Sequence, residues 1–184
     1  MANHHAIGLI ESNSIAKGIE ASDIMAKTAD VTILVAKTIC PGKYIVLIGG
    51  NISNVKQSVE AVLRLTPETM VDHFVIPNIH PSILPAIGGG KVIEKVEAIG
   101  VIETYSVAAT IEAADMAVKT AQVEPIRMHL AFGIGGKSYV VLTGDISSIN
   151  TAVEVGSSIA SERGFLVQRI VLARPHQQVI DSLL

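Results

Sequence analysis

The sequence predicts an α+β fold made of two tandem ferredoxin-like units, each with the element order β-α-β-β-α-β. Two observations predict it. The chain contains an internal repeat, because residues 6–31 align with residues 98–123 and 15 of these 26 positions are identical. Within each copy, short β-branched runs also alternate with longer segments of helical periodicity. We therefore expect a first domain over residues 1–90 and a second over residues 91–184.

The apolar pattern of the first copy predicts its elements. Four strand-like runs lie at residues 6–11, 31–37, 44–48 and 71–76. Ser14 is a suitable cap for a helix that runs to about residue 29, with Ile15 and Ile19 on one face. Ser53 is expected to cap a second helix, which carries Val55 and Val59 on its apolar face.

The second copy repeats this order. Its strands are expected near residues 98–103, 126–131, 139–142 and 167–172, and its helices near residues 106–121 and 147–162. The segment between the copies is rich in Pro and Gly, which is typical of a connector, and residues 81–87 are compatible with a turn of helix. We expect the domain boundary near Gly90.

Composition limits the function classes. Aromatic residues make up 3% and the net charge is -3, which argues against single-stranded nucleic acid as a partner. The apolar runs are far shorter than the roughly 20 residues of a membrane span, and no secretory signal is visible at the start. One cysteine excludes an internal disulfide and fits a reducing cytoplasm. The mean hydropathy of +0.48 indicates that extra apolar surface is hidden, most simply in a homo-oligomer.

The chain's only cysteine lies in a short loop between two predicted strands, made of Thr38, Ile39, Cys40, Pro41 and Gly42. Pro41 fixes its own φ and biases Cys40 toward an extended conformation, and Gly42 can take a positive φ that turns the chain back. A free cysteine is most often a small, inert, buried residue. A thiol on a shaped loop instead favours a metal ligand. One thiol cannot build a metal site alone, so such a site requires several chains to meet.

The corresponding loop of the second copy contains Phe132, Gly133, Ile134, Gly135 and Gly136. The alignment offset changes from 92 to 94 residues at this point, so the two copies differ in length at the cysteine loop. The glycines do not lead from a strand into a helix, which argues against a nucleotide-binding loop. They give the loop a compact backbone that can approach a symmetry axis closely, and Phe132 is a candidate to help close a pore there.

Several motifs together resemble the bacterial microcompartment shell domain. They are Ala-Ile-Gly-x-Ile-Glu, Glu-Ala-x-Asp-x-x-x-Lys-Thr-Ala and the endings Pro77-Asn-Ile-His80 and Ala173-Arg-Pro-His176. Two fused copies resemble the tandem-domain shell proteins. The loops Lys37-Thr-Ile-Cys-Pro-Gly-Lys43 and Phe132-Gly-Ile-Gly-Gly-Lys137 resemble one branch of them, the iron–sulfur-binding shell proteins of propanediol-utilisation-type compartments.

This resemblance implies a homotrimer that forms a pseudohexameric tile in a hexagonal layer with other shell proteins. It implies a structural protein of a cytoplasmic microcompartment shell rather than an enzyme. In that branch Cys40 and its two symmetry mates would donate thiolates to one [4Fe–4S] cluster on the threefold axis. The implied role is electron transfer across the shell or delivery of the cluster, and the resemblance does not distinguish them. An encapsulated redox enzyme is a further implied partner.

The resemblance also implies roles at the edge of the tile. Lys27 and Lys119 occupy the same place in the two copies and would lie against neighbouring tiles. Arg174 would dock into the adjoining tile, whereas the first copy has Asn78 at that position. One of the two kinds of edge is therefore expected to bind more weakly.

Four duplicated polar residues have simpler interpretations. Glu11 and Glu103 end the first strand of each copy and have no nucleophile or base at a recognisable spacing, so we interpret them as structural rather than catalytic. His80 and His176 are interpreted as local hydrogen-bonding residues at strand exits rather than metal ligands.

Two alternatives remain open from the sequence. The tile can have a central opening that passes a small molecule, with Cys40 only lining it and no cluster. The chain can instead be a tandem ferredoxin-like regulator that binds small ligands between subunits and forms a dimer or tetramer.

Overall fold

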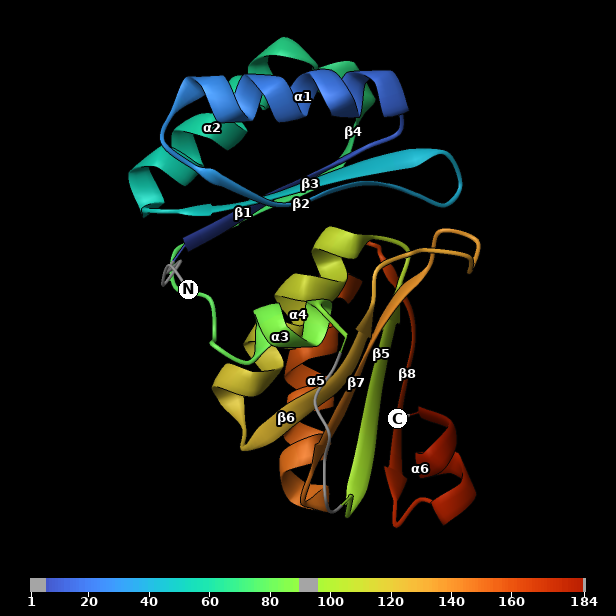
Figure 1. The fold of residues 1–184 in the computed structure, drawn as a ribbon. Coiled ribbons are helices and arrows are strands. Elements are labelled where there is room, and N and C mark those ends of the chain that lie inside the picture. The colour runs from blue at the N-terminus through green and yellow to red at the C-terminus, as the bar shows by residue number, and fades with distance from the viewer. Residues whose placement is uncertain (1–5, 90–95, 184) are drawn as a thin grey trace. The chain divides into compact units, whose positions relative to one another are not determined.

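Each copy of the repeat forms a four-stranded antiparallel sheet with two helices packed on one face (Figure 1). The computed structural model describes residues 6–89 and 96–183. The first copy contains β1 (Ala6–Ser12), α1 (Ile15–Thr28), β2 (Thr32–Ile39), β3 (Lys43–Gly50), α2 (Ile52–Leu65), a short 3-10 turn (Pro67–Thr69) and β4 (Met70–Ile76). The second contains β5 (Ala98–Thr104), α4 (Val107–Thr120), β6 (Val123–His129), β7 (Ser138–Gly144), α5 (Ile146–Glu162) and β8 (Leu166–Ala173).

Two short helices follow the sheets. α3 (Ile83–Ile87) comes after β4, where a turn of helix is expected, and α6 (Gln177–Leu183) comes after β8. α6 lies on the sheet face that α4 and α5 leave open, where Ile180 packs with Ile99, Ile126 and Val141.

The chain divides into two compact units that do not follow the repeat at every point. Residues up to Ile79 pack together with Phe132–Gly136, a loop of the second copy. His80–Ala131 packs with the residues from Lys137 onward, so the segment after β4 belongs with the second unit. The predicted boundary near Gly90 lies outside the described residues.

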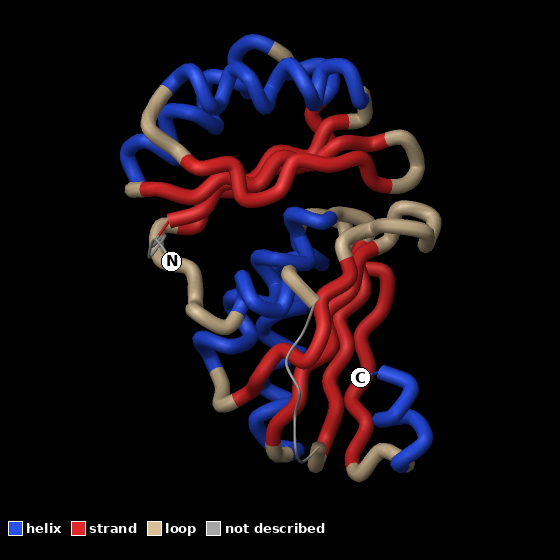
Figure 2. Tube along the Cα trace, viewed as in Figure 1, coloured by secondary structure: helices blue, strands red, loops and turns tan. Residues whose placement is uncertain are grey.

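The strand orders are β2-β3-β1-β4 and β6-β7-β5-β8, which is the ferredoxin-like order. Figure 2 shows the helices of each copy in blue and its strands in red. Matching positions pair in both sheets, with Leu9 opposite Leu47 and Val101 opposite Val141. The predicted fold class is therefore confirmed. No helix within residues 6–89 and 96–183 is long and apolar enough to cross a membrane.

Each core is aliphatic and depends on one strand glycine. Ile10, Met25 and Val59 are among the fully buried residues of the first core. A Cβ on Gly8 would lie 2.7 Å from Val59 Cγ2, and a Cβ on the equivalent Gly100 would lie 2.5 Å from Val153 Cγ2. Both distances are shorter than packed carbon atoms tolerate, so these glycines let α2 and α5 lie close against the sheets.

Two predicted boundaries are wrong. Asn51, not Ser53, caps α2, because its side chain accepts the Asn54 N–H at 3.0 Å and the helix begins at Ile52. The second strand of the second copy, β6, spans residues 123–129 rather than 126–131, because Ala131 has a φ of 54° and cannot continue an extended strand.

Candidate functional site at the cysteine hairpin

Cys40 lies in the turn between β2 and β3. The turn contains residues 40–42, and Ile39 and Lys43 form the last pair of the hairpin. Gly42 has a φ of 75°, a region that glycine enters without steric penalty. Cys40 is a free, half-buried thiol that precedes a cis peptide bond to Pro41. These observations confirm the predicted loop position and the glycine turn.

The β6–β7 loop of the second copy is longer than the β2–β3 turn, and several of its residues adopt the left-handed backbone conformation. Gly133, Gly135 and Gly136 have φ values of 74°, 67° and 83°. Phe132 is 69% exposed at this loop. The three glycines therefore allow a compact loop with an exposed aromatic side chain, as expected from the sequence.

The two loops touch at the cysteine. The backbone N–H of Gly133 donates to the Sγ of Cys40 at 3.4 Å. A Cβ on Gly136 would lie 2.6 Å from Pro41 Cδ and 2.8 Å from the Cys40 carbonyl oxygen, so only glycine permits this approach. N–H groups directed at sulfur stabilise negative charge on thiolates and on cluster sulfurs.

The structure brings only some of the predicted loop residues together. Cys40 and Pro41 contact Gly133 and Gly136, whereas Thr38 and Ile39 belong to strand β2. Ile39 is buried and packs below the turn.

Ion pairs between acids and lysines stabilise the base of both hairpins. The carboxylate of the fully buried Glu11 pairs with Lys43, and Glu103 pairs with Lys137 at 2.6 Å. The hydrogen bond and the charge of Glu103 raise the pKa of Lys137 above its ordinary value. Glu11 therefore holds Lys43 at the start of β3, and Glu103 holds Lys137 just before β7. These pairs agree with the structural role expected for both acids.

One chain does not provide a complete metal site in the part that the structure describes. No group of three or more His, Cys, Asp or Glu residues lies close enough there to hold a metal ion. A metal centre at Cys40 would therefore need thiolates from further copies, as the sequence indicates.

The two predicted edge lysines make equivalent local contacts. Lys27 pairs with Asp23 at 2.6 Å, and Lys119 pairs with Asp115 at 2.5 Å. Both lysines are thereby held along their helices four residues after their partners.

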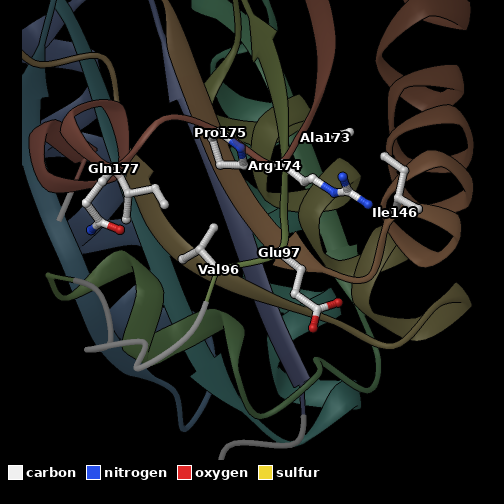
Figure 3. A pocket seen from close by; sticks show the side chains of 8 residues that line it. Val96, Glu97, Ile146, Ala173, Arg174, Pro175 and Gln177 are labelled. Carbon is white, nitrogen blue, oxygen red and sulfur yellow. The ribbon is translucent and has the colours of Figure 1, made fainter.

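Arg174 lines a pocket between the end of β8 and the start of α5 (Figure 3). Its side chain extends toward Ile146, and its backbone N–H donates to the Glu97 carbonyl oxygen at 2.9 Å. Its φ of 50° is uncommon for a residue with a side chain.

Both predicted histidines make local hydrogen bonds. The Nδ1 atom of His80 lies 2.8 Å from the Ser82 hydroxyl, and the Nδ1 atom of His176 accepts the Gln178 N–H at 3.3 Å. These contacts agree with the interpretation of both residues as local hydrogen-bonding residues at strand exits.

Comparison with known proteins identifies the family. The family model for the BMC domain matches the sequence twice, at residues 6–79 and at residues 98–175. The chain belongs to the bacterial microcompartment (BMC) shell family. It is 51% identical over 174 residues to the bacterial microcompartment shell protein PduT of Citrobacter freundii, covering 95% of each chain.

Solved structures agree with the BMC assignment. A crystal structure of a microcompartment protein from Desulfitobacterium hafniense DCB matches with a TM-score of 0.86 and 47% identity, over 97% of this chain and 99% of that one. The fused permuted hexameric shell protein MSM0275 matches with a TM-score of 0.68 and 18% identity, over 88% and 86% of the two chains, which shows a shared fold.

As a tandem-domain BMC protein of the PduT type, the chain is a structural component of a microcompartment shell in the bacterial cytoplasm, as expected. Membership of this shell family argues against the alternative that the chain is a ligand-binding regulator.

Sequence reasoning missed two features of the BMC site. It did not pair Glu11 with Lys43 or Glu103 with Lys137, although the repeat places both pairs at equivalent positions. It also missed the contact of Gly136 with the cysteine turn, for which an isolated sequence gives no signal.

Proposed function

We propose that the chain is a trimeric, pseudohexameric shell tile that holds one [4Fe–4S] cluster on its threefold axis and passes electrons across the shell. Cys40 of each copy provides one thiolate. Three thiolates leave one iron with a ligand from outside the protein. The other components of the hexagonal layer are further BMC shell proteins, and a redox enzyme inside the compartment exchanges the electrons.

The observation that carries this proposal is the environment of the Cys40 sulfur. The only thiol of the chain lies at a hairpin tip, and the Gly133 N–H is directed at it from 3.4 Å. An inert structural cysteine is ordinarily enclosed by apolar side chains. This one instead has a polar donor on one side and lies on a turn.

The type of ligand at this site fits an iron–sulfur cluster. Thiolates are the ligands that such clusters select, and backbone N–H donors to sulfur are one means by which proteins set their potential. Within one chain the number of thiolates is too small, because the sequence contains a single cysteine. A threefold axis supplies the missing two. When bound, the cluster would supply one-electron redox chemistry at the axis.

The flanking residues would shape the site around the cluster. Pro41 and Gly42 fix the turn that presents the sulfur, and Gly133 supplies the N–H. Phe132, 69% exposed, would lie near the axis and exclude water beside the cluster. Lys27, Lys119 and Arg174 would contact the neighbouring tiles.

Cys40→Ser tests the proposal. Protein purified without oxygen should show the broad visible absorbance of an iron–sulfur cluster and contain iron. The serine variant should lose both and keep the trimeric mass in sedimentation, because the thiol is not part of either core. A wild-type chain that stays colourless after chemical reconstitution would contradict the redox role and leave a tile with a small-molecule opening.

A further inference from the structure

The sulfur of Cys40 and its hydrogen-bond donor come from different copies of the repeat. The first copy supplies the thiol on its β2–β3 turn, and the second supplies the Gly133 N–H on its β6–β7 loop, 3.4 Å from Sγ. That loop, Phe132–Gly136, packs in the same compact unit as the cysteine turn. The second copy contains no cysteine, since Cys40 is the only one in the chain. The two loops therefore contribute different parts of one site.

A second glycine holds the donor loop against the cysteine turn. Gly136 has a φ of 83° and approaches so closely that a Cβ there would lie 2.8 Å from the Cys40 carbonyl oxygen. A Cβ on Gly133 would meet no atom within 4 Å, so Gly133 is not needed for close approach. Its φ of 74° instead gives the loop the left-handed turn that directs its N–H at the sulfur. One residue seats the loop, and the other donates.

The geometry is that of a hydrogen bond to sulfur. Sulfur is larger than oxygen, so a donor–acceptor distance of 3.4 Å is short enough here, although it would be long for a carbonyl acceptor. Cys40 is half-buried, and hydrogen bonds are electrostatically stronger away from bulk water. The bond therefore acts on the charge of the sulfur more than a fully exposed contact would.

The charged groups at the base of the two hairpins do not replace this donor. Lys43 is paired with Glu11, and Lys137 is paired with Glu103 at 2.6 Å. Each lysine is offset by a carboxylate, so each pair adds little net field at the sulfur. The Gly133 N–H, in contrast, has its dipole directed at Sγ.

An N–H donor favours the more negative of two charge states. In the proposed function one electron enters from the enclosed redox enzyme and leaves across the shell, and no bond forms or breaks. The added electron increases the negative charge on the coordinating thiolates. A donor that stabilises this charge stabilises the reduced state more than the oxidised state, which raises the reduction potential. With one N–H in each of three copies, the effect applies to all three thiolates.

We propose that the Gly133 N–H tunes the cluster, because by donating to the Cys40 thiolate it raises the reduction potential above that of three thiolates without donors. Gly133 and Gly136 then act as positioning residues, the first for the donor and the second for its loop. The copy of the repeat that has no cysteine thereby controls the redox property of the copy that has one. The inference rests on the proposed function, because it requires the cluster to be present.

Replacing one backbone N–H by an ester oxygen tests the proposal without changing a side chain. Glycolic acid in place of Gly133, introduced during translation with an acylated transfer RNA, removes the donor and adds no Cβ. Glycolic acid in place of Gly135 is the matched control, because Gly135 lies in the same loop and has a similar φ of 67°. Both esters are purified without oxygen, and their iron content and trimeric mass are compared with those of the wild type. Redox titration of the visible absorbance measures the midpoint potential.

The Gly133 ester should hold as much iron as the wild type and have a lower potential. At a fixed solution potential, its ratio of reduced to oxidised cluster should fall at least tenfold, which corresponds to about 59 mV for one electron. The Gly135 ester should keep the wild-type potential.

A potential that is unchanged in the Gly133 ester, or lowered equally in both esters, would overturn the inference. A Gly133 ester that holds no cluster while the Gly135 ester holds one would also overturn it, because the N–H would then be needed for assembly rather than for the potential. A wild-type chain that binds no iron would contradict the proposed function and this inference with it, a result distinct from loaded proteins with equal potentials.

Discussion

At the scale of single residues, the glycines of the β6–β7 loop have separable roles. Gly135 and Gly136 both have positive φ values, 67° and 83°. A Cβ on Gly135 would meet no atom within 4 Å, whereas one on Gly136 would collide with Pro41 and the Cys40 carbonyl. The backbone strain of a substitution is therefore similar at both positions, and only Gly136 adds a steric conflict with the cysteine turn.

Gly136→Ala is expected to separate the two loops, with Gly135→Ala as the matched control. Both should cost about 1–2 kcal/mol for left-handed backbone, and Gly136→Ala should cost about 1–3 kcal/mol more from overpacking. Thermal unfolding measures this difference. The Cys40 thiol should also react faster with a thiol reagent in the Gly136→Ala chain alone. Equal reactivity in both variants would show that the loop contact does not protect the sulfur.

The sequence indicated the residues of this site but not their contacts. The single cysteine, its turn glycine and the glycine-rich partner loop were all visible in the repeat, and their positions are confirmed. The Gly133 N–H bond to Cys40 was not predictable, because it joins residues 93 positions apart through backbone geometry. The cluster itself and the edge roles of Lys27, Lys119 and Arg174 remain predictions.

At the scale of elements, each sheet accepts its second helix through one glycine. Gly100 on β5 leaves space that Val153 of α5 fills, and Gly8 on β1 does the same for Val59 of α2. Because valine is stiff at χ1, the side chain cannot move away from an added methyl group.

Gly100→Ala should therefore destabilise the second unit by about 1–3 kcal/mol through overpacking. The double variant Gly100→Ala/Val153→Ala should recover part of that loss, because it removes the atom that the new Cβ would meet. Chemical denaturation of the four chains of this double-mutant cycle measures the coupling. Additive effects would contradict the close packing of α5 on β5.

Element types followed from periodicity, but two boundaries depended on local backbone detail: the end of β6 on the positive φ of Ala131, and the start of α2 on a hydrogen bond. The sequence predicted Ser53 as the cap of α2, but the nearby Asn51 and Asn54 have side chains that can also cap a helix, and composition does not distinguish the three. The outcome depends on which side chain reaches an N–H, and the equivalent Asp145 caps α5 in the same way. Aligning the two copies would have favoured Asn51 over Ser53.

At the scale of the whole molecule, the two copies of the repeat differ in the apolar surface that they expose. Ile15 and Ile19 of α1 are 40% and 55% exposed, whereas the matching Val107 and Ile111 of α4 are fully buried. The predicted tile edge also differs between the copies, because Arg174 of the second copy corresponds to Asn78 in the first.

Arg174→Ala should leave the trimer intact and weaken its assembly into sheets, since the guanidinium lies at the strand end and outside both apolar cores. Electron microscopy of concentrated protein measures sheet formation. Lys56→Ala is the control, because Lys56 is exposed and pairs weakly with Glu60 at 3.8 Å. Sheets that form equally well in both variants would show that Arg174 does not contribute to contacts between tiles.

The most direct test of the central claim is a crystal structure grown without oxygen, with anomalous scattering recorded at the iron edge. The account predicts a single iron peak on a threefold axis, with the Cys40 sulfurs of three copies within bonding distance of it. An axis without iron, or Cys40 sulfurs that point away from one another, would contradict the account.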